Sequence, residues 1–259
     1  MKREVKELKR IARGNLQGNY LWLIRAFVFC SLIVSLIELP FSLMTNEIQL
    51  SIQNIIYYIA VLLITITSVV LTVGQYCLHL RLARTGKIYL AELFYPLRHD
   101  ANRLIFSEIA LWGLRLIGLA PIIGALAIVH FYSTSNMYLL ALGLGILGCL
   151  LTIFIEVTFG MTYFVLIDGE ELSVMEALKA TTKLIKGNKG RYFYMLLSFI
   201  GMYFLAVLTL GIGLLWVQPY VMHTTTLFYL DVKSELSEIL EKRRKDEPTP
   251  APVAFDTYA

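Results

Sequence analysis

Residues 171–191 read ELSVMEALKATTKLIKGNKGR, and two apolar runs follow them as far as Asp231. Ser173 and Glu176 have the spacing of a capping box, and Gly187 is of the type that commonly ends a helix. Between them a mostly apolar stripe recurs at helical spacing: Val174, Met175, Leu178, Thr182 and Ile185. The pattern predicts an amphipathic helix that lies on a membrane surface before the chain turns into the membrane.

The composition is that of a membrane protein. Of the 259 residues 57% are hydrophobic, and the mean hydropathy is +0.66, whereas soluble domains are about half apolar or less. The apolar residues also form runs of the roughly 20 residues that a helix needs to cross a bilayer. We therefore expect an all-α membrane protein with six transmembrane helices, at about 20–43, 55–78, 104–130, 138–167, 192–210 and 214–230.

Basic residues are confined to alternate connections between these spans. Residues 1–19 hold six Lys or Arg, and 79–103, 168–191 and 232–247 hold five each, whereas 44–54, 131–137 and 211–213 hold none. With six spans every basic segment falls on one side, which should be cytoplasmic, and both termini lie there. We expect residues 1–245 to form a single polytopic domain and the proline-rich residues 246–259 to form a disordered cytoplasmic tail.

Three segments before the odd-numbered spans are similar. Gly14 and Asn15 precede the first span, Asn102 precedes the third, and Gly187 and Asn188 precede the fifth, so that the asparagines are 87 and 86 residues apart. We interpret this as three two-span hairpins, each preceded by a cytoplasmic interfacial amphipathic helix and a small polar corner. The alternative is that any surface helix needs such a corner before a span.

The motifs of the last third carry a family resemblance. Residues 173–180, 186–191 and 208–216, followed by Pro219-Tyr220, resemble the bacterial integral-membrane family catalogued as domain of unknown function 975. The resemblance is strongest over 171–231 and weaker over 1–43. It implies a multi-pass protein of the bacterial cytoplasmic (plasma) membrane of Gram-positive-type bacteria, and it implies no activity and no catalytic residues.

Ionisable side chains within the predicted spans are the first candidates for function, because each costs several kcal/mol there unless it is paired. Arg115 and Glu156 each lie 12 residues from the charged residue at the cytoplasmic end of their span, hence about 18 Å inward at 1.5 Å per residue. This equal depth predicts a buried Arg115–Glu156 ion pair. Glu108 shares a helical face with Arg115, and Arg25 either pairs with Glu108 or extends to the membrane interface. These four residues form a polar track for ions, protons or headgroups, or else fix the order of the helices.

The remaining motifs indicate packing rather than chemistry. Pro219 interrupts the sixth span and predicts a helix kink, and the polar cytoplasmic half of that span should face protein or a watery pocket. Ala141, Gly145 and Cys149 form a stripe of small residues that predicts a close helix contact. The four histidines are scattered, and the chain contains no HExxH, serine-elbow or CxxC motif. We expect no catalytic residue, metal or cofactor.

We expect a non-enzymatic support or interaction protein that binds membrane lipids, through anionic headgroups at the cytoplasmic face, or a membrane-protein partner. The alternative is a small transporter or lipid-handling channel that uses the polar residues of spans three, four and six. The net charge of +4 follows from the positive-inside bias, so nucleic acid is not an expected partner.

Overall fold

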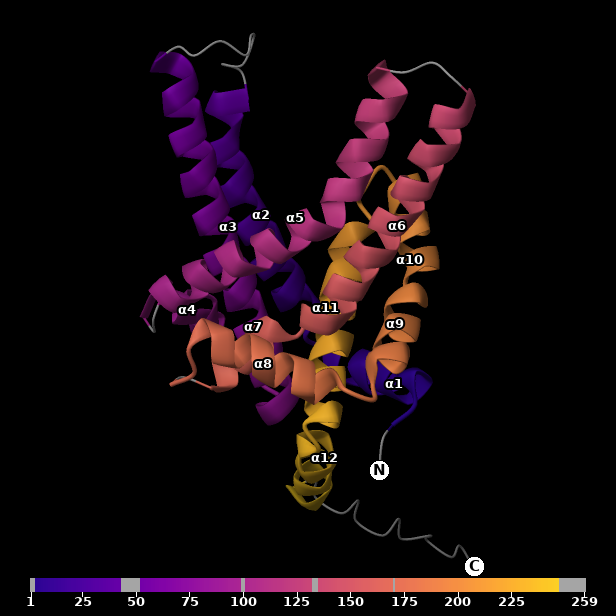
Figure 1. The fold of residues 1–259 in the computed structure, drawn as a ribbon. Coiled ribbons are helices and arrows are strands. Elements are labelled where there is room, and N and C mark those ends of the chain that lie inside the picture. The colour runs from indigo at the N-terminus through magenta and orange to yellow at the C-terminus, as the bar shows by residue number, and fades with distance from the viewer. Residues whose placement is uncertain (1–2, 43–51, 99–100, 132–134, 170, 247–259) are drawn as a thin grey trace, which may run out of the picture.

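The computed structural model describes residues 3–42, 52–98, 101–131, 135–169 and 171–246, and over these residues its regular structure is entirely helical (Figure 1). The elements are α1 (Val5–Leu16), α2 (Tyr20–Ser42), α3 (Ile52–Thr85), η1 (Leu90–Phe94), α4 (Tyr95–Arg98), α5 (Ala101–Phe131), α6 (Ser135–Phe159), α7 (Thr162–Asp168), α8 (Val174–Ile185), α9 (Lys189–Leu197), α10 (Ile200–Leu208), α11 (Leu214–Val232) and α12 (Glu235–Asp246). Of the predicted tail, residues 247–259 lie outside the described residues, and Asp246 is the last residue of α12.

Five helical stretches are long and apolar enough to cross a membrane, and they correspond to the first five expected spans. They are Tyr20–Pro40, Ile59–Thr85, Ala101–Phe131, Asn136–Asp168 and Lys189–Leu208. The expected sixth span falls on α11, which is not among these five. Its glutamine, histidine and three consecutive threonines lower its hydropathy. Five apolar helices of this length make the chain a membrane protein, and a sixth crossing stays a prediction.

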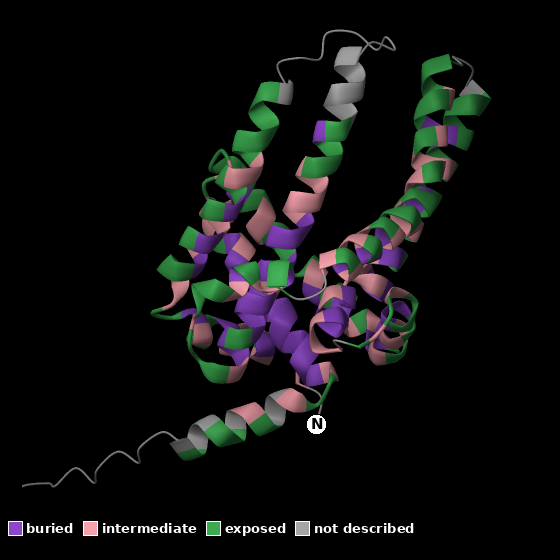
Figure 2. Cartoon of the chain, turned by 90° about the vertical axis from the view of Figure 1, so that its left-hand side faces the viewer, coloured by how far each residue is buried: buried purple, intermediate pink, exposed green. Residues whose placement is uncertain are grey.

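The helix α11 is the centre of the molecule. From Val217 to Asp231 all of its residues except Gln218 and Val221 are buried, and it contacts α1, α2, α3, α10 and α12. The buried residues gather in the lower part of the view in Figure 2. The polar side chains of α11 therefore face protein rather than lipid, as expected.

The upper ends of the molecule are two helix pairs that splay apart, α2 with α3 and α5 with α6 (Figure 1). Their outer surfaces are apolar: Leu32, Leu36, Ile109, Leu126 and Leu139 are each about 60% exposed or more. Large apolar side chains on the outside of long helices are typical of surfaces that contact lipid.

The closest contact between α5 and α6 is not at Gly145, the middle of the predicted stripe of small residues. A Cβ added to Gly148 would lie 2.5 Å from Ile122 Cγ1, whereas one added to Gly145 would meet nothing within 4 Å. Of the predicted stripe only Ala141 is buried, and Cys149 is exposed. The prediction was wrong by less than one helical turn, because small size alone does not tell which side of an apolar helix faces its partner.

The surface helices α1 and α8 lie across the lower end in Figure 1, which we call the basal end together with α4 and α12. The capping box of α8 is confirmed: the backbone N–H of Ser173 donates to Glu176 Oε2 over 2.9 Å, and the Ser173 side chain accepts from the Glu176 N–H. However, α8 packs against α5, α6 and α7. It buries Ala177, Leu178, Thr181 and Ile185, whereas Met175 of the predicted stripe is 62% exposed. Its apolar face therefore lies against the bundle rather than facing outward.

The corners that follow α1 and α8 have the same geometry, although in a different register from the predicted one. Gly18 and Gly187 both have left-handed φ angles, of 81° and 78°. The residue after each glycine, Asn19 or Asn188, donates its N–H over 2.9 Å to the last helical carbonyl, that of Leu16 or Ile185. The predicted Gly14 and Asn15 lie inside α1, and the equivalent of Gly187-Asn188 is therefore Gly18-Asn19.

The middle copy of the predicted repeat does not form a comparable helix. The segment before the third span consists of the short elements η1 and α4, and Asn102 lies in the first turn of α5. Residues 99–100, between α4 and α5, lie outside the described residues. The described chain thus contains two similar helix–corner units rather than three.

Candidate functional site

The predicted Arg115–Glu156 ion pair is present, but the prediction that it is buried was wrong. Arg115 Nε donates to Glu156 Oε1 over 2.9 Å, which joins α5 to α6, and Arg115 Nη1 donates to Glu108 Oε1 over 3.2 Å. The Glu156 side chain is 44% exposed and that of Glu108 only 12%, so the pair lies at the side of the bundle rather than deep inside it. One guanidinium faces two carboxylates, and Glu108 Oε2 is buried without a hydrogen-bond partner among the described residues.

Arg25 does not belong to this group. It is exposed, and its guanidinium carbon lies 5.0 Å from the ring centroid of Trp22. It forms no ion pair with Glu108, so the first of the two predicted alternatives was wrong. Counting residues along a span fixes depth but not the direction around the helix, and Arg25 points outward.

An apolar groove of about 720 Å³ lies beside Glu108, between α3 and α5. Val61, Leu62, Thr65, Ile66 and Val69 line it from α3, and Ile105, Glu108, Ile109, Trp112, Gly113 and Leu116 line it from α5. Glu108 is the single ionisable residue among these lining residues.

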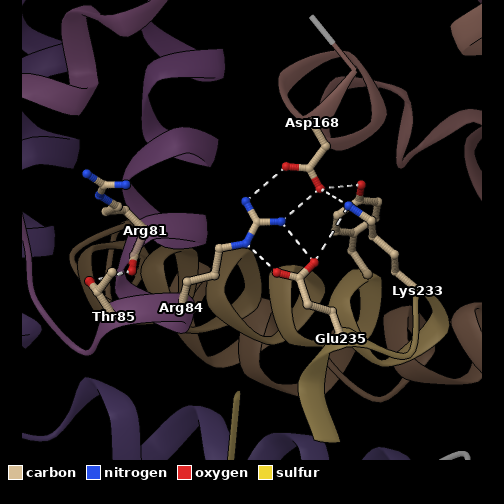
Figure 3. Close-up of polar contacts among 7 residues, drawn as sticks. Arg81, Arg84, Thr85, Asp168, Lys233 and Glu235 are labelled. Carbon is tan, nitrogen blue, oxygen red and sulfur yellow. Dashed lines mark hydrogen bonds and ion pairs between the residues drawn. The ribbon is translucent and has the colours of Figure 1, made fainter. Parts of the chain in front are cut away.

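At the basal end, Arg84 joins three parts of the chain (Figure 3). Its Nη1 and Nη2 donate to the two carboxylate oxygens of Asp168, both over 2.9 Å, and its Nε and Nη2 donate to Glu235 over 2.7 and 2.9 Å. Lys233 Nζ and the Tyr229 hydroxyl also donate to Asp168, over 2.7 and 2.8 Å. These contacts tie the end of α3 to α7 and to the connection between α11 and α12.

A second group surrounds Asp231, whose side chain is 2% exposed. Arg191 of α9 and Arg3, which precedes α1, both form ion pairs with it, and the Arg3 backbone N–H donates to Asp231 Oδ2 over 3.3 Å. The Arg191 guanidinium also lies 4.5 Å from the ring centroid of Phe228. The last turn of α11 is thus joined to both α1 and α9.

Asn15, which lies inside α1, belongs to a polar chain that sequence reasoning did not reveal. Asn15 Nδ2 lies 3.2 Å from His223 Nε2, and His223 Nδ1 lies 3.4 Å from His79 Nδ1. The chain joins α1, α11 and α3 in the core. Asn188 is buried at the corner that follows α8. At the predicted kink, α11 continues as one helix through the buried Pro219.

The groups around Asp168 and Asp231 hold the basal end together. Within the described residues there is no cluster of three His, Cys, Asp or Glu side chains that could hold a metal ion. The carboxylates of Asp168 and Asp231 are each engaged by at least two donors. Sequence reasoning missed them because it searched the middle of the spans. One feature of the sequence marks these ion pairs. Three apolar runs have an ionisable residue at or near their basal end: Arg84, Asp168 and Asp231.

Comparison with known proteins gives one match. A family model described as a protein of unknown function (DUF975) matches residues 1–236. No curated protein and no solved structure matches the chain.

Proposed function

The chain belongs to this DUF975 family of unknown function, and we propose from its geometry that it is a non-enzymatic support protein of the bacterial cytoplasmic membrane. In this proposal the basal end faces the cytoplasm and binds anionic lipid headgroups or a membrane-protein partner.

The observation that carries the proposal is the orientation of α1 and α8. Both helices turn their apolar faces toward the bundle and their cations outward. The outward cations Lys6, Arg10 and Arg13 belong to α1, and Lys179, Lys183 and Lys186 belong to α8 and its C-terminal cap. A surface that carries exposed cations at the end of membrane-crossing helices attracts anionic headgroups, by about 1 kcal/mol per Lys or Arg.

A support role also accords with the use of the polar groups. The polar side chains of α11 bind other groups of the protein. His223 contacts His79, and the hydroxyls of Thr224, Thr225 and Thr226 donate to backbone carbonyls one turn earlier. Arg84 and Asp168 bind each other at the basal end. Groups that bind one another hold helices in place and are not free to bind a passing substrate.

The experiment is co-purification from bacterial membranes in a medium that retains native lipid. We expect anionic phospholipid, or a reproducible protein partner, to be enriched relative to the bulk membrane. Replacing Lys179 and Lys183 by glutamine should lower the lipid enrichment. Recovery of neither anionic lipid nor a partner would overturn the proposal.

The second candidate is a small transporter or lipid-handling channel, and the groove beside Glu108 favours it. In a variant without Cys30, Cys77 and Cys149, a cysteine placed at Thr65 in this groove distinguishes the two candidates. Modification by a small water-soluble thiol reagent in membranes would support a water-accessible path and hence transport. If only a lipid-soluble reagent modified this cysteine, the result would favour the role as a support protein.

A further inference from the structure

A basic pocket of about 600 Å³ lies between α1 and α9 at the basal end. The residues that line it are Arg3, Glu4, Val5, Lys6, Lys9, Arg191, Tyr194 and Ser198. Four of them are cationic and one is anionic. The carboxylate of Asp231 pairs with Arg3 and Arg191, and that of Glu7 lies 3.6 Å from Arg3. With Glu4 included, the four cations face three carboxylates, and the pocket keeps an excess of one positive charge.

Two of these cations are held in place by the protein. Arg191 is fixed by Asp231 and by the Phe228 ring, while its Nε and Nη1 are buried without a hydrogen-bond partner among the described residues. Lys9 Nζ donates to the Ser198 carbonyl over 3.1 Å and lies 3.8 Å from the ring centroid of Phe199. Burial, and then the neighbouring Arg13, lower the pKa of Lys9. An anion bound nearby would act in the opposite direction and favour the charged form of Lys9.

Lys6 is the free member of the set. Its side chain is exposed and makes no hydrogen bond or ion pair with the described residues. The first turn of α1 lines the same pocket and has no side-chain cap, so it adds to the positive potential there.

The surroundings of the pocket are apolar on one side. Tyr194, which lines it, is 62% exposed, Leu197 one turn further is 49% exposed, and Ile200 at the start of α10 is 58% exposed. These residues belong to the membrane-crossing stretch Lys189–Leu208. A ligand that fits both parts carries an anionic oxygen group and an apolar chain.

We propose that this pocket binds the phosphate of an anionic phospholipid, with Arg191, Lys6 and Lys9 around the phosphate and an acyl chain along Tyr194 and Leu197. Arginine matches the geometry of phosphate oxygens with its fork of N–H donors, and lysine supplies a movable point charge. The proposal rests on the proposed function, since it names the lipid site within it.

The test uses the full-length protein in detergent and native mass spectrometry. Phosphatidylglycerol and phosphatidylcholine are titrated separately, and the apparent Kd of the first bound lipid is measured for wild type, Lys6→Gln and Arg10→Gln. Arg10 is the matched control, because it is an exposed cation one turn along the same helix that does not line the pocket. Arg191→Gln is a further variant, and a thermal melt of the same sample shows whether it still folds.

We expect wild type to prefer phosphatidylglycerol. Lys6→Gln should weaken that binding about five-fold, which corresponds to a loss of about 1 kcal/mol for one cation beside the phosphate. Arg10→Gln should change it less than about two-fold, because Arg10 lies outside the pocket and solvent screens its charge from the bound phosphate. Inorganic phosphate in excess should not displace the lipid, because it lacks the chain that contacts α9.

Equal binding of the two lipids would overturn the proposal. Equal effects of Lys6→Gln and Arg10→Gln would also overturn it, because they would indicate a diffuse basic surface; anionic lipid would still be enriched in membranes and the proposed function would stand. Displacement by inorganic phosphate would overturn the assignment to a lipid and identify a site for the free anion.

Discussion

Replacing Arg84 by glutamine should detach the ends of three helices from one another. The guanidinium donates four hydrogen bonds to Asp168 and Glu235 over 2.7–2.9 Å, and its side chain is 30% exposed. Removing one partner of a buried ion pair costs 3–5 kcal/mol, and the partial exposure here favours the lower end, about 3 kcal/mol. Lys233 still neutralises Asp168 in the variant, which limits the loss.

The assay is thermal unfolding of the purified protein in one detergent. For a chain of this size, a loss of about 3 kcal/mol lowers the apparent Tm by about 6 to 12 °C. Arg81→Gln is the control: Arg81 lies one turn earlier in α3, is 53% exposed, and its guanidinium contacts Glu92 at 3.4 Å and lies 5.7 Å from the ring centroid of Tyr89. Removal of these exposed contacts should cost less than about 1 kcal/mol. Equal shifts for the two variants would refute the reasoning, because Arg84 would then contribute no more than an exposed charge.

Three further predictions test other parts of the structure. Glu156→Gln removes the ion pair with Arg115 that joins α5 to α6. Because the Glu156 side chain is partly exposed, the apparent Tm should fall by only about 2 to 4 °C; an unchanged Tm would count against the ion pair. Gly148→Ala should lower the free energy of unfolding by about 1–3 kcal/mol, because the added methyl group would overlap Ile122. Gly145→Ala is its control and should leave the free energy of unfolding unchanged, because its methyl group would meet open space. In the capping box, hydrogen bonds from the Ser173 side chain and then its backbone lower the pKa of Glu176. This stabilisation of α8 is present above the ordinary glutamate pKa and is lost as the pH falls through the lowered pKa, so Glu176→Gln should remove that acid dependence from the hydrogen-exchange protection of α8.

The helices themselves were predictable from the sequence. Apolar runs of about 20 residues have few alternatives to a helix in lipid, and five of them have the predicted type and place. Residue counting also placed Arg115 and Glu156 at one depth, because the rise per residue of a helix is fixed.

Direction around a helix was not predictable in the same way. The pairing of Arg25 with Glu108, one of its two predicted alternatives, was inferred from depth, and the helix contact of Gly145 was inferred from size. Arg25 is exposed, and a Cβ at Gly145 would meet open space. In an almost uniformly apolar helix no periodic pattern marks the side that meets a neighbour. The basal ion pairs around Asp168 and Asp231 were missed for a related reason, since their partners come from α3, α9, the α11–α12 connection and Arg3, which precedes α1.

The register of the first corner could have been read more closely. Before the first span the dipeptide Gly-Asn occurs twice, at 14–15 and at 18–19. Only the second follows the last residue of the stripe Val5, Leu8, Ala12 and Leu16, all of which are buried. An apolar stripe that continues past a Gly-Asn pair indicates that the helix continues as well.

The most direct test of the proposed arrangement is the side of the membrane on which α8 lies. In a variant without native cysteines, Lys179→Cys in α8 and Asn136→Cys at the start of α6 are exposed and are treated with a membrane-impermeant maleimide. We predict labelling of Asn136→Cys in intact bacteria, and labelling of Lys179→Cys only after the membrane is permeabilised. Labelling of Lys179→Cys in intact cells would contradict a cytoplasmic basal end, and with it the binding of anionic headgroups on that face.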